Sequence, residues 1–184
     1  VLNSDCSLAA QQPSWHADLL VTKWLRQDDR WSCEVTDRHP QCEGLEAIYR
    51  AMVVGLADYV RKNRFPGVIL GLSGGIDSAL SAVVAVDALG SDAVHCVMMP
   101  SPYTAPESLA DASETARLLG VRLDTIDIAP AMEAFGEMLE VAENEAANGG
   151  GTTAENIQSR SRAVILMGLS NALGSMVLTT GNKS

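Results

Sequence analysis

Strand-like and helix-like segments alternate four times between residues 68 and 180 of this 184-residue chain. Short apolar runs predict strands at residues 68–72, 93–99, 123–128 and 175–180. Apolar residues spaced three and four positions apart predict helices at residues 78–89, 107–119, 132–147 and 155–173. Such alternation is typical of βαβ units. We therefore expect an α/β fold, doubly wound, with one parallel sheet covered by helices on both faces.

The segments around this alternation are less regular. Residues 1–40 show no sustained period but hold all three tryptophans, which indicates a segment that packs against another surface. Apolar residues at helical spacing then predict a helix over residues 43–63, which ends before Pro66. The glycine-rich residues 148–152 predict a loop.

The charge of the chain limits its ligands. It carries 13 basic and 23 acidic side chains, a net charge of −10. Residues 67–184 hold only 5 of the basic side chains but 14 of the acidic ones. Non-specific nucleic-acid binding needs many Lys and Arg side chains, so we expect no nucleic-acid partner. A phosphate ligand of the second part must be held by backbone N–H groups, a few placed cations or a bridging metal.

Neither a zinc site nor a membrane span is predicted. The four cysteines stand 27, 9 and 54 residues apart, which favours free thiols in a reducing cytoplasm over a structural zinc site. Residues 163–182 contain no charge and are about as long as a membrane helix. Polar residues and Gly174 interrupt them, so a buried helix followed by a buried strand explains this stretch better.

One turn between a predicted strand and a predicted helix carries most of the chemical information. Residues 73–78 read SGGIDS, directly after the apolar run 68–72. Two adjacent glycines let the backbone turn sharply, and the free N–H groups at the start of the next helix favour an anion. Ser73 and Ser78 add hydroxyl donors. The turn therefore predicts a site for phosphate or pyrophosphate.

Asp77 is the unexpected member of this turn, because a carboxylate repels phosphate. Two interpretations stay open: a divalent cation lies between Asp77 and the phosphates, or Asp77 only caps the helix. We favour the cation. The turn lacks both the lysine of a P-loop and the G-x-G-x-x-G pattern of dinucleotide sites, so it is a third kind of phosphate loop.

The SGGIDS stretch resembles the SGG-x-DS loop of the ATP pyrophosphatases, which include NAD, GMP and asparagine synthetases and tRNA-thiolating enzymes. Residues 98–108 (MMPSPYTAPES), 156–162 (NIQSRSR) and 178–184 (LTTGNKS) are similar to the corresponding stretches of the glutamine-dependent NAD synthetases. The resemblance covers about residues 42–184. It implies an adenine nucleotide alpha hydrolase-like fold.

The resemblance also implies a reaction. ATP adenylates the nicotinate carboxylate of deamido-NAD, and ammonia from glutamine then displaces AMP to give NAD, with Mg²⁺ present. Asp77 is the implied catalytic and metal-binding residue, and Arg160 is implied to contact deamido-NAD. The residues implied to bind ATP are Gly71, Leu72, Ser73, Gly74, Gly75, Ile76, Asp77, Ser78 and Thr180.

Further expectations concern the organisation of the chain. Residues 1–41 are predicted to be the tail of a preceding amidase domain with a linker, and residues 42–184 the N-terminal part of a synthetase domain. We expect a chain truncated at its C-terminus, inactive alone, in a family of cytoplasmic homo-oligomers without a membrane partner. Two alternatives stay open: amidation of another acid, as in GMP synthetase, and a non-catalytic ATP-binding module.

Overall fold

The computed structural model describes residues 1–36, 38–139 and 151–181. The chain forms two compact units, Val1–Gly55 and Leu56–Ser184, and the division falls inside helix α1 (Gly44–Lys62). This helix confirms the predicted helix over residues 43–63. Residues 140–150, which include the end of one predicted helix and most of the predicted loop, lie outside the described residues.

The first unit contains a hairpin that the sequence pattern did not predict. Strands β1 (Trp24–Gln27) and β2 (Arg30–Cys33) pair antiparallel. Asp28 and Asp29 connect them with φ angles of +45° and +62°. The type I′ turn of two-residue hairpins needs a positive φ at both positions, and aspartate tolerates it better than most residues. Asn-Gly or Asp-Gly is the usual signal for such a turn, and Asp-Asp lacks it.

The second unit is built on a parallel sheet of four strands. They are β3 (Val68–Gly71), β4 (Val94–Met98), β5 (Arg122–Thr125) and β6 (Met176–Val177), in the spatial order β5-β4-β3-β6. The predicted α/β fold with a parallel sheet is therefore confirmed. β6 is shorter than the predicted strand 175–180, because the Leu178 N–H makes the last ladder bond, 2.8 Å to the Ile69 carbonyl oxygen, before the chain leaves β3.

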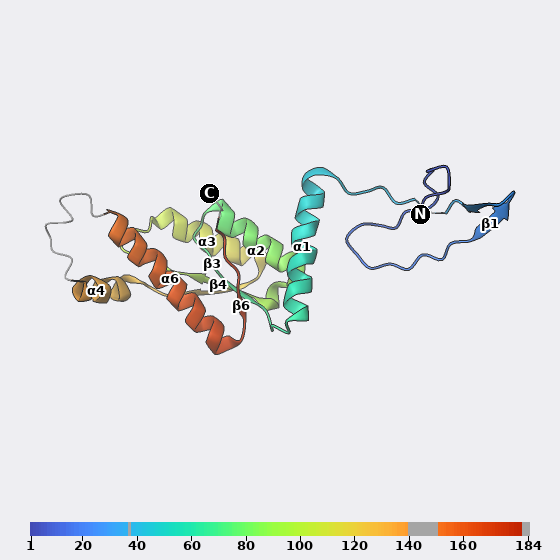
Figure 1. The fold of residues 1–184 in the computed structure, drawn as a ribbon. Coiled ribbons are helices and arrows are strands. Elements are labelled where there is room, and N and C mark those ends of the chain that lie inside the picture. The colour runs from blue at the N-terminus through green and yellow to red at the C-terminus, as the bar shows by residue number, and fades with distance from the viewer. Residues whose placement is uncertain (37, 140–150, 182–184) are drawn as a thin grey trace. The chain divides into compact units, whose positions relative to one another are not determined.

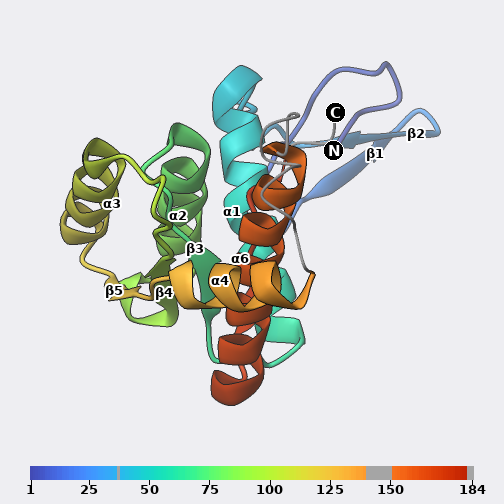
Figure 2. The same cartoon turned by 90° about the vertical axis from the view of Figure 1, so that its left-hand side faces the viewer.

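Helices lie on both faces of this sheet, as Figure 1 shows. Figure 2 shows α2 (Ile76–Leu89) beside α3 (Pro106–Leu119), while α4 (Ala129–Met138) crosses α6 (Gly151–Leu173) on the other side. A short 3₁₀ turn, η1 (Ser91–Ala93), precedes β4. α6 begins four residues before the predicted start, so the prediction of a loop at residues 151–152 is wrong. α2 begins two residues before its predicted start, because Gly75 is its cap.

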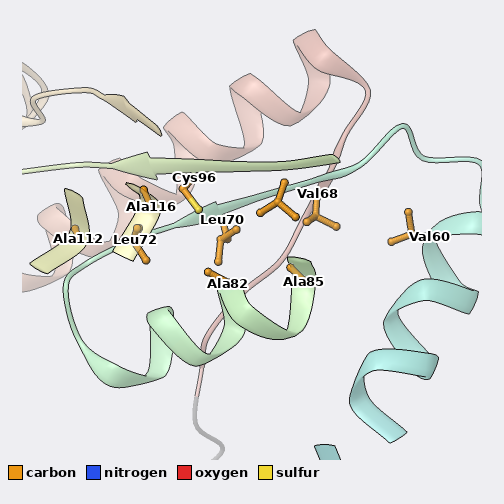
Figure 3. Packing of buried hydrophobic residues seen from close by; sticks show 10 residues of the cluster. Val60, Val68, Leu70, Leu72, Ala82, Ala85, Cys96, Ala112 and Ala116 are labelled. Atoms are coloured by element: carbon orange, nitrogen blue, oxygen red, sulfur yellow. The ribbon is translucent and has the colours of Figure 1, made fainter. Parts of the chain in front are cut away.

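Alternation along the strands divides the core between the two faces. Val68, Leu70 and Leu72 point to one face, where they pack with alanines of α2 and α3, among them Ala82 and Ala116 (Figure 3). Ile69 and Val97 belong to the opposite cluster, with Ile128 and the apolar face of α6. Alanines let α2 and α3 approach the sheet closely, and the Leu70 and Leu72 side chains that precede the turn are buried. The turn after β3 therefore stands on a rigid base.

Candidate functional site

A cavity of about 440 Å³ lies where the carboxyl ends of three strands meet. The chain runs outward from β3 to β4 and β5 and then returns to place β6 on the other side of β3. Ligands of open α/β sheets bind at such a reversal of strand order. The cavity is lined by the ends of β3 and β4, by the segment after β6 and by one face of α6. The lining residues are Gly71, Leu72, Ser73, Val97, Met98, Met99, Pro100, Thr104, Leu109, Ser159, Arg162, Ala163, Leu166, Met167, Val177, Leu178, Thr179 and Thr180.

Two serine hydroxyls brace the turn that begins at this cavity. The Ser78 hydroxyl, almost fully buried, donates to the Gly75 carbonyl oxygen at 2.9 Å and accepts the Ser73 N–H at 3.2 Å. The Ser73 hydroxyl lies 3.0 Å from it and accepts the Gly75 N–H at 3.3 Å. Ser78 thus holds the loop in shape, while Ser73 is exposed and lines the cavity.

The two adjacent glycines of the turn have different requirements. Gly74 has a φ of +83°, and a Cβ at this position would lie 2.3 Å from the Ser108 carbonyl oxygen of α3. Gly75 has a φ of −81°, and a Cβ there would meet only the Ser73 hydroxyl, at 3.4 Å. Of these two glycines, only Gly74 must be glycine for the fold, because the missing Cβ lets the turn approach the backbone of α3.

The first turn of α2 presents unused hydrogen-bond donors. The first backbone bond onto this turn runs from the Ala79 N–H to the Gly75 carbonyl oxygen, 3.1 Å. Among the described residues, no hydrogen bond uses the N–H groups of Ile76, Asp77 or Ser78. Three free donors together with the positive end of the helix dipole form an anion site.

The Asp77 carboxylate does not cap this helix. Gly75 is the cap, and among the described residues the Asp77 carboxylate accepts no N–H of the first helical turn, so the helix-cap interpretation of Asp77 is wrong. Asp77 is exposed, and within the part of the chain that the structure describes its carboxylate has no hydrogen-bond or ion-pair partner. No group of three metal-ligating side chains occurs among the described residues. Asp77 therefore offers a carboxylate beside the anion site, outside any such group.

The structure separates the two arginines of α6. Arg160 is exposed and does not line the cavity, whereas Arg162 lines it and donates from Nε to the Met99 carbonyl oxygen at 3.1 Å. Burial lowers the pKa of the Arg162 guanidinium. Residues two apart on a helix project in nearly opposite directions, so the two cannot share one face. Thr180, predicted from the resemblance, does line the cavity.

Sequence reasoning left Arg162 without a role, although a signal was present. The α6 residues that line the cavity recur at spacings of three and four, and Ser159, Arg162 and Leu166 belong to this set. A face drawn at helical period through the polar residues would have selected Arg162. Arg160 was selected by motif position alone.

The remaining predictions concern cysteines and membranes. All four cysteines are free thiols, as predicted. The structure adds that Cys33 and Cys96 are buried and Cys6 is exposed. None of the helices in residues 1–36, 38–139 and 151–181 has the length and apolar character needed to cross a bilayer.

Comparisons with known proteins agree with this geometry. The sequence model of the family "NAD synthase" matches residues 48–184. A glutamine-dependent NAD(+) synthetase of Rhodobacter capsulatus is 50% identical over the whole chain, which spans 33% of that relative's length. The structure of the Acinetobacter baumannii glutamine-dependent NAD+ synthetase in complex with ADP superimposes with a TM-score of 0.84 and 41% identity, over 97% of this chain and 33% of that one. The structure of an NMN synthetase from Francisella tularensis superimposes with a TM-score of 0.66 and 27% identity, over 77% of this chain and 56% of that one.

Proposed function

Because this chain belongs to the NAD synthase family, we propose that it forms the ATP-binding part of an enzyme that amidates deamido-NAD to NAD. The observation that carries the proposal is the cavity at the strand-order reversal, which adjoins a turn with three free backbone donors. A site of this kind suits a nucleotide, whose base needs an apolar pocket and whose phosphates need donors. The neighbour bound to ADP supports the same assignment.

The proposed reaction has two steps. A carboxylate oxygen of the nicotinate group attacks the α-phosphorus of ATP, and the bond to the β-phosphate oxygen breaks to release pyrophosphate. Ammonia then attacks the carbonyl carbon of the adenylate, the C–O bond breaks to release AMP, and the nitrogen loses a proton. The first step turns a poor leaving group into a good one, so most of the catalytic work is positioning and charge stabilisation.

The residues of the turn supply that stabilisation. The N–H groups of Ile76, Asp77 and Ser78 neutralise phosphate charge, and the Ser73 hydroxyl adds a donor at the edge of the cavity. Thr180 lies in the same cavity after β6. Each such donor at a site of developing charge typically contributes about 10²–10³ in rate.

Asp77 fits the Mg²⁺ that the family implies. Mg²⁺ takes one or two carboxylates together with phosphate oxygens, and Asp77 is an exposed carboxylate without a partner among the described residues, next to the phosphate donors. When bound, the ion would neutralise charge on the phosphates. Asp77 would hold it at the start of α2, and Arg160 would contact the deamido-NAD acceptor.

The predicted supply of ammonia from glutamine, the amidase origin of residues 1–41, the homo-oligomer and the cytoplasmic location stay predictions. So does the acceptor itself, because an NMN synthetase shares this fold. A GMP synthetase-like reaction or a non-catalytic ATP-binding module is tested by the same experiment.

A chimaera tests the proposed function directly. These 184 residues replace the matching third of the R. capsulatus relative, to which they are 50% identical. With ATP, Mg²⁺, ammonium and deamido-NAD, we expect NAD, AMP and pyrophosphate in equal amounts. ATP binding without AMP release would support a non-catalytic module, and amidation of xanthosine monophosphate in place of deamido-NAD would support the GMP synthetase alternative.

Substitution in the chimaera tests the role of Asp77. Asp77→Asn should lower AMP release about 10²–10³-fold, because it removes the carboxylate beside the phosphates. Asp92→Asn is the matched control, since Asp92 is an exposed acid in a first helical turn at the opposite ends of the strands. Equal rates for the two variants would contradict the metal role of Asp77.

A further inference from the structure

The cavity holds one charged side chain. All 18 residues that line it lie in the described part of the chain, and Arg162 alone among them is ionisable at neutral pH. The unit around it contains few other basic residues. The positive charge in this cavity therefore comes from one position on α6.

The Arg162 guanidinium uses only its Nε in a hydrogen bond to the described residues. Its Nε donates to the Met99 carbonyl oxygen at the end of β4. Within residues 1–36, 38–139 and 151–181, no carboxylate pairs with the guanidinium and no hydrogen bond engages its Nη atoms. The four Nη hydrogens are therefore available, in a planar fork that matches two oxygens of one phosphate.

A half-buried guanidinium that pairs with no carboxylate of the described residues carries a desolvation cost. Burial disfavours the charged form, which is the physical cause of the lowered pKa of this group. An anion that enters the cavity removes this cost and adds charge-assisted hydrogen bonds. The Met99 bond fixes the guanidinium beforehand, so little side-chain entropy is lost on binding.

We propose that Arg162 binds a phosphate oxyanion of the nucleotide in the cavity, which Ser73 at the start of the phosphate turn also lines. The inference rests on the proposed nucleotide site and adds a specific residue to it. It separates the two arginines of the NIQSRSR stretch, with Arg162 on the phosphates and Arg160 outside the cavity.

A merely structural role makes a different prediction. If Arg162 only held the Met99 carbonyl oxygen, its loss would deform the whole pocket and weaken the binding of nucleoside and nucleotide alike. If it binds phosphate, its loss affects ligands in proportion to their phosphate charge. Adenosine, ADP and pyrophosphate therefore form a diagnostic set of probes.

The test uses calorimetry on the 184-residue chain without Mg²⁺, so that no ion held by Asp77 contributes to binding and its carboxylate acts alike on every variant. Arg162→Met keeps the length of the stem, and Arg162→Lys keeps the charge. Arg117→Met is the control, since Arg117 is exposed and pairs with Glu114 on α3. We expect Arg162→Met to weaken the binding of ADP and pyrophosphate about 10- to 100-fold and to leave the binding of adenosine unchanged. Arg162→Lys should weaken the binding of ADP and pyrophosphate less, because it keeps the charge.

If Arg162→Met weakened the binding of adenosine and ADP equally, or weakened neither, the role of Arg162 would be overturned and the proposed function would stay intact. Failure of the unsubstituted chain to bind either ligand would overturn both. Modification of the unsubstituted chain by phenylglyoxal needs no variant, so it decides the question even if Arg162→Met does not fold. Pyrophosphate, but not adenosine, should then protect Arg162, and protection by both or by neither would refute the inference.

Discussion

Gly74 is expected to be the most sensitive glycine of the phosphate turn. The strain of a positive φ in a residue with a Cβ costs about 1–2 kcal/mol. The Gly74→Ala methyl would also lie 2.3 Å from the Ser108 carbonyl oxygen, a backbone atom that cannot move aside cheaply. Forced overlap of this kind adds about 1–3 kcal/mol. We therefore expect a loss of about 2–5 kcal/mol in the free energy of unfolding.

Two control variants separate these contributions. Gly120→Ala carries only the conformational cost, because Gly120 has a φ of +67° at the end of α3 and nothing lies within 4 Å of its added Cβ. Gly75→Ala carries neither cost, since its φ is −81° and its added Cβ makes an ordinary contact. The expected order of destabilisation is Gly74→Ala, then Gly120→Ala, then Gly75→Ala.

Differential scanning calorimetry measures this order. In a domain of this size each kcal/mol corresponds to roughly 2–4 °C in Tm, so Gly74→Ala should lower Tm by roughly 4–20 °C and Gly120→Ala by about half of that or less. Gly74→Ala as mild as Gly120→Ala would refute the close approach of the turn to α3. A large effect of Gly75→Ala would refute the distinction between the two adjacent glycines.

Two further predictions concern titratable side chains of the sheet. Hydrogen bonds from Arg122 (2.6 Å) and His95 (2.8 Å) lower the pKa of Asp124 from its ordinary 3.8, so this carboxylate stabilises the fold above pH 3.8 and the contribution is lost as the pH falls below that value. Asp124→Asn should therefore lower Tm by a few degrees at most at pH 7, because the pair is partly exposed, and the difference should shrink as the pH falls below 3.8. A difference that stays constant with pH would contradict this role of Asp124. Burial raises the pKa of the Cys96 thiol to about 11, so little of it is the reactive thiolate. Dithionitrobenzoate should therefore label the exposed Cys6 at once and Cys96 only on unfolding. Rapid labelling of both cysteines in the native state would contradict the buried position of Cys96.

The hydrophobic pattern of the sequence predicted some helices and strands correctly and missed others, and the residues at their ends explain the difference. The buried strands β3 and β4 are apolar except for His95, and their neighbours α2 and α3 have clear ends at Gly90 and Gly120, so pattern alone located them within two residues. The hairpin β1–β2 lacks the usual turn residues. The start of α6 at Gly151 lies in a run of glycines that is typical of loops, because glycine has weak helix propensity, so the pattern predicted a later start.

The amino-acid sequence by itself determined the alternation of strands and helices, the phosphate turn after β3 and the family to which the motifs point. These properties depend on hydrophobic period and on short motifs, which are local. Tertiary structure alone decided that Gly74 needs to be glycine, that Asp77 does not cap α2 and that Arg162 rather than Arg160 lines the cavity. Each of these depends on what lies across space from the residue, and a one-dimensional pattern does not contain that information.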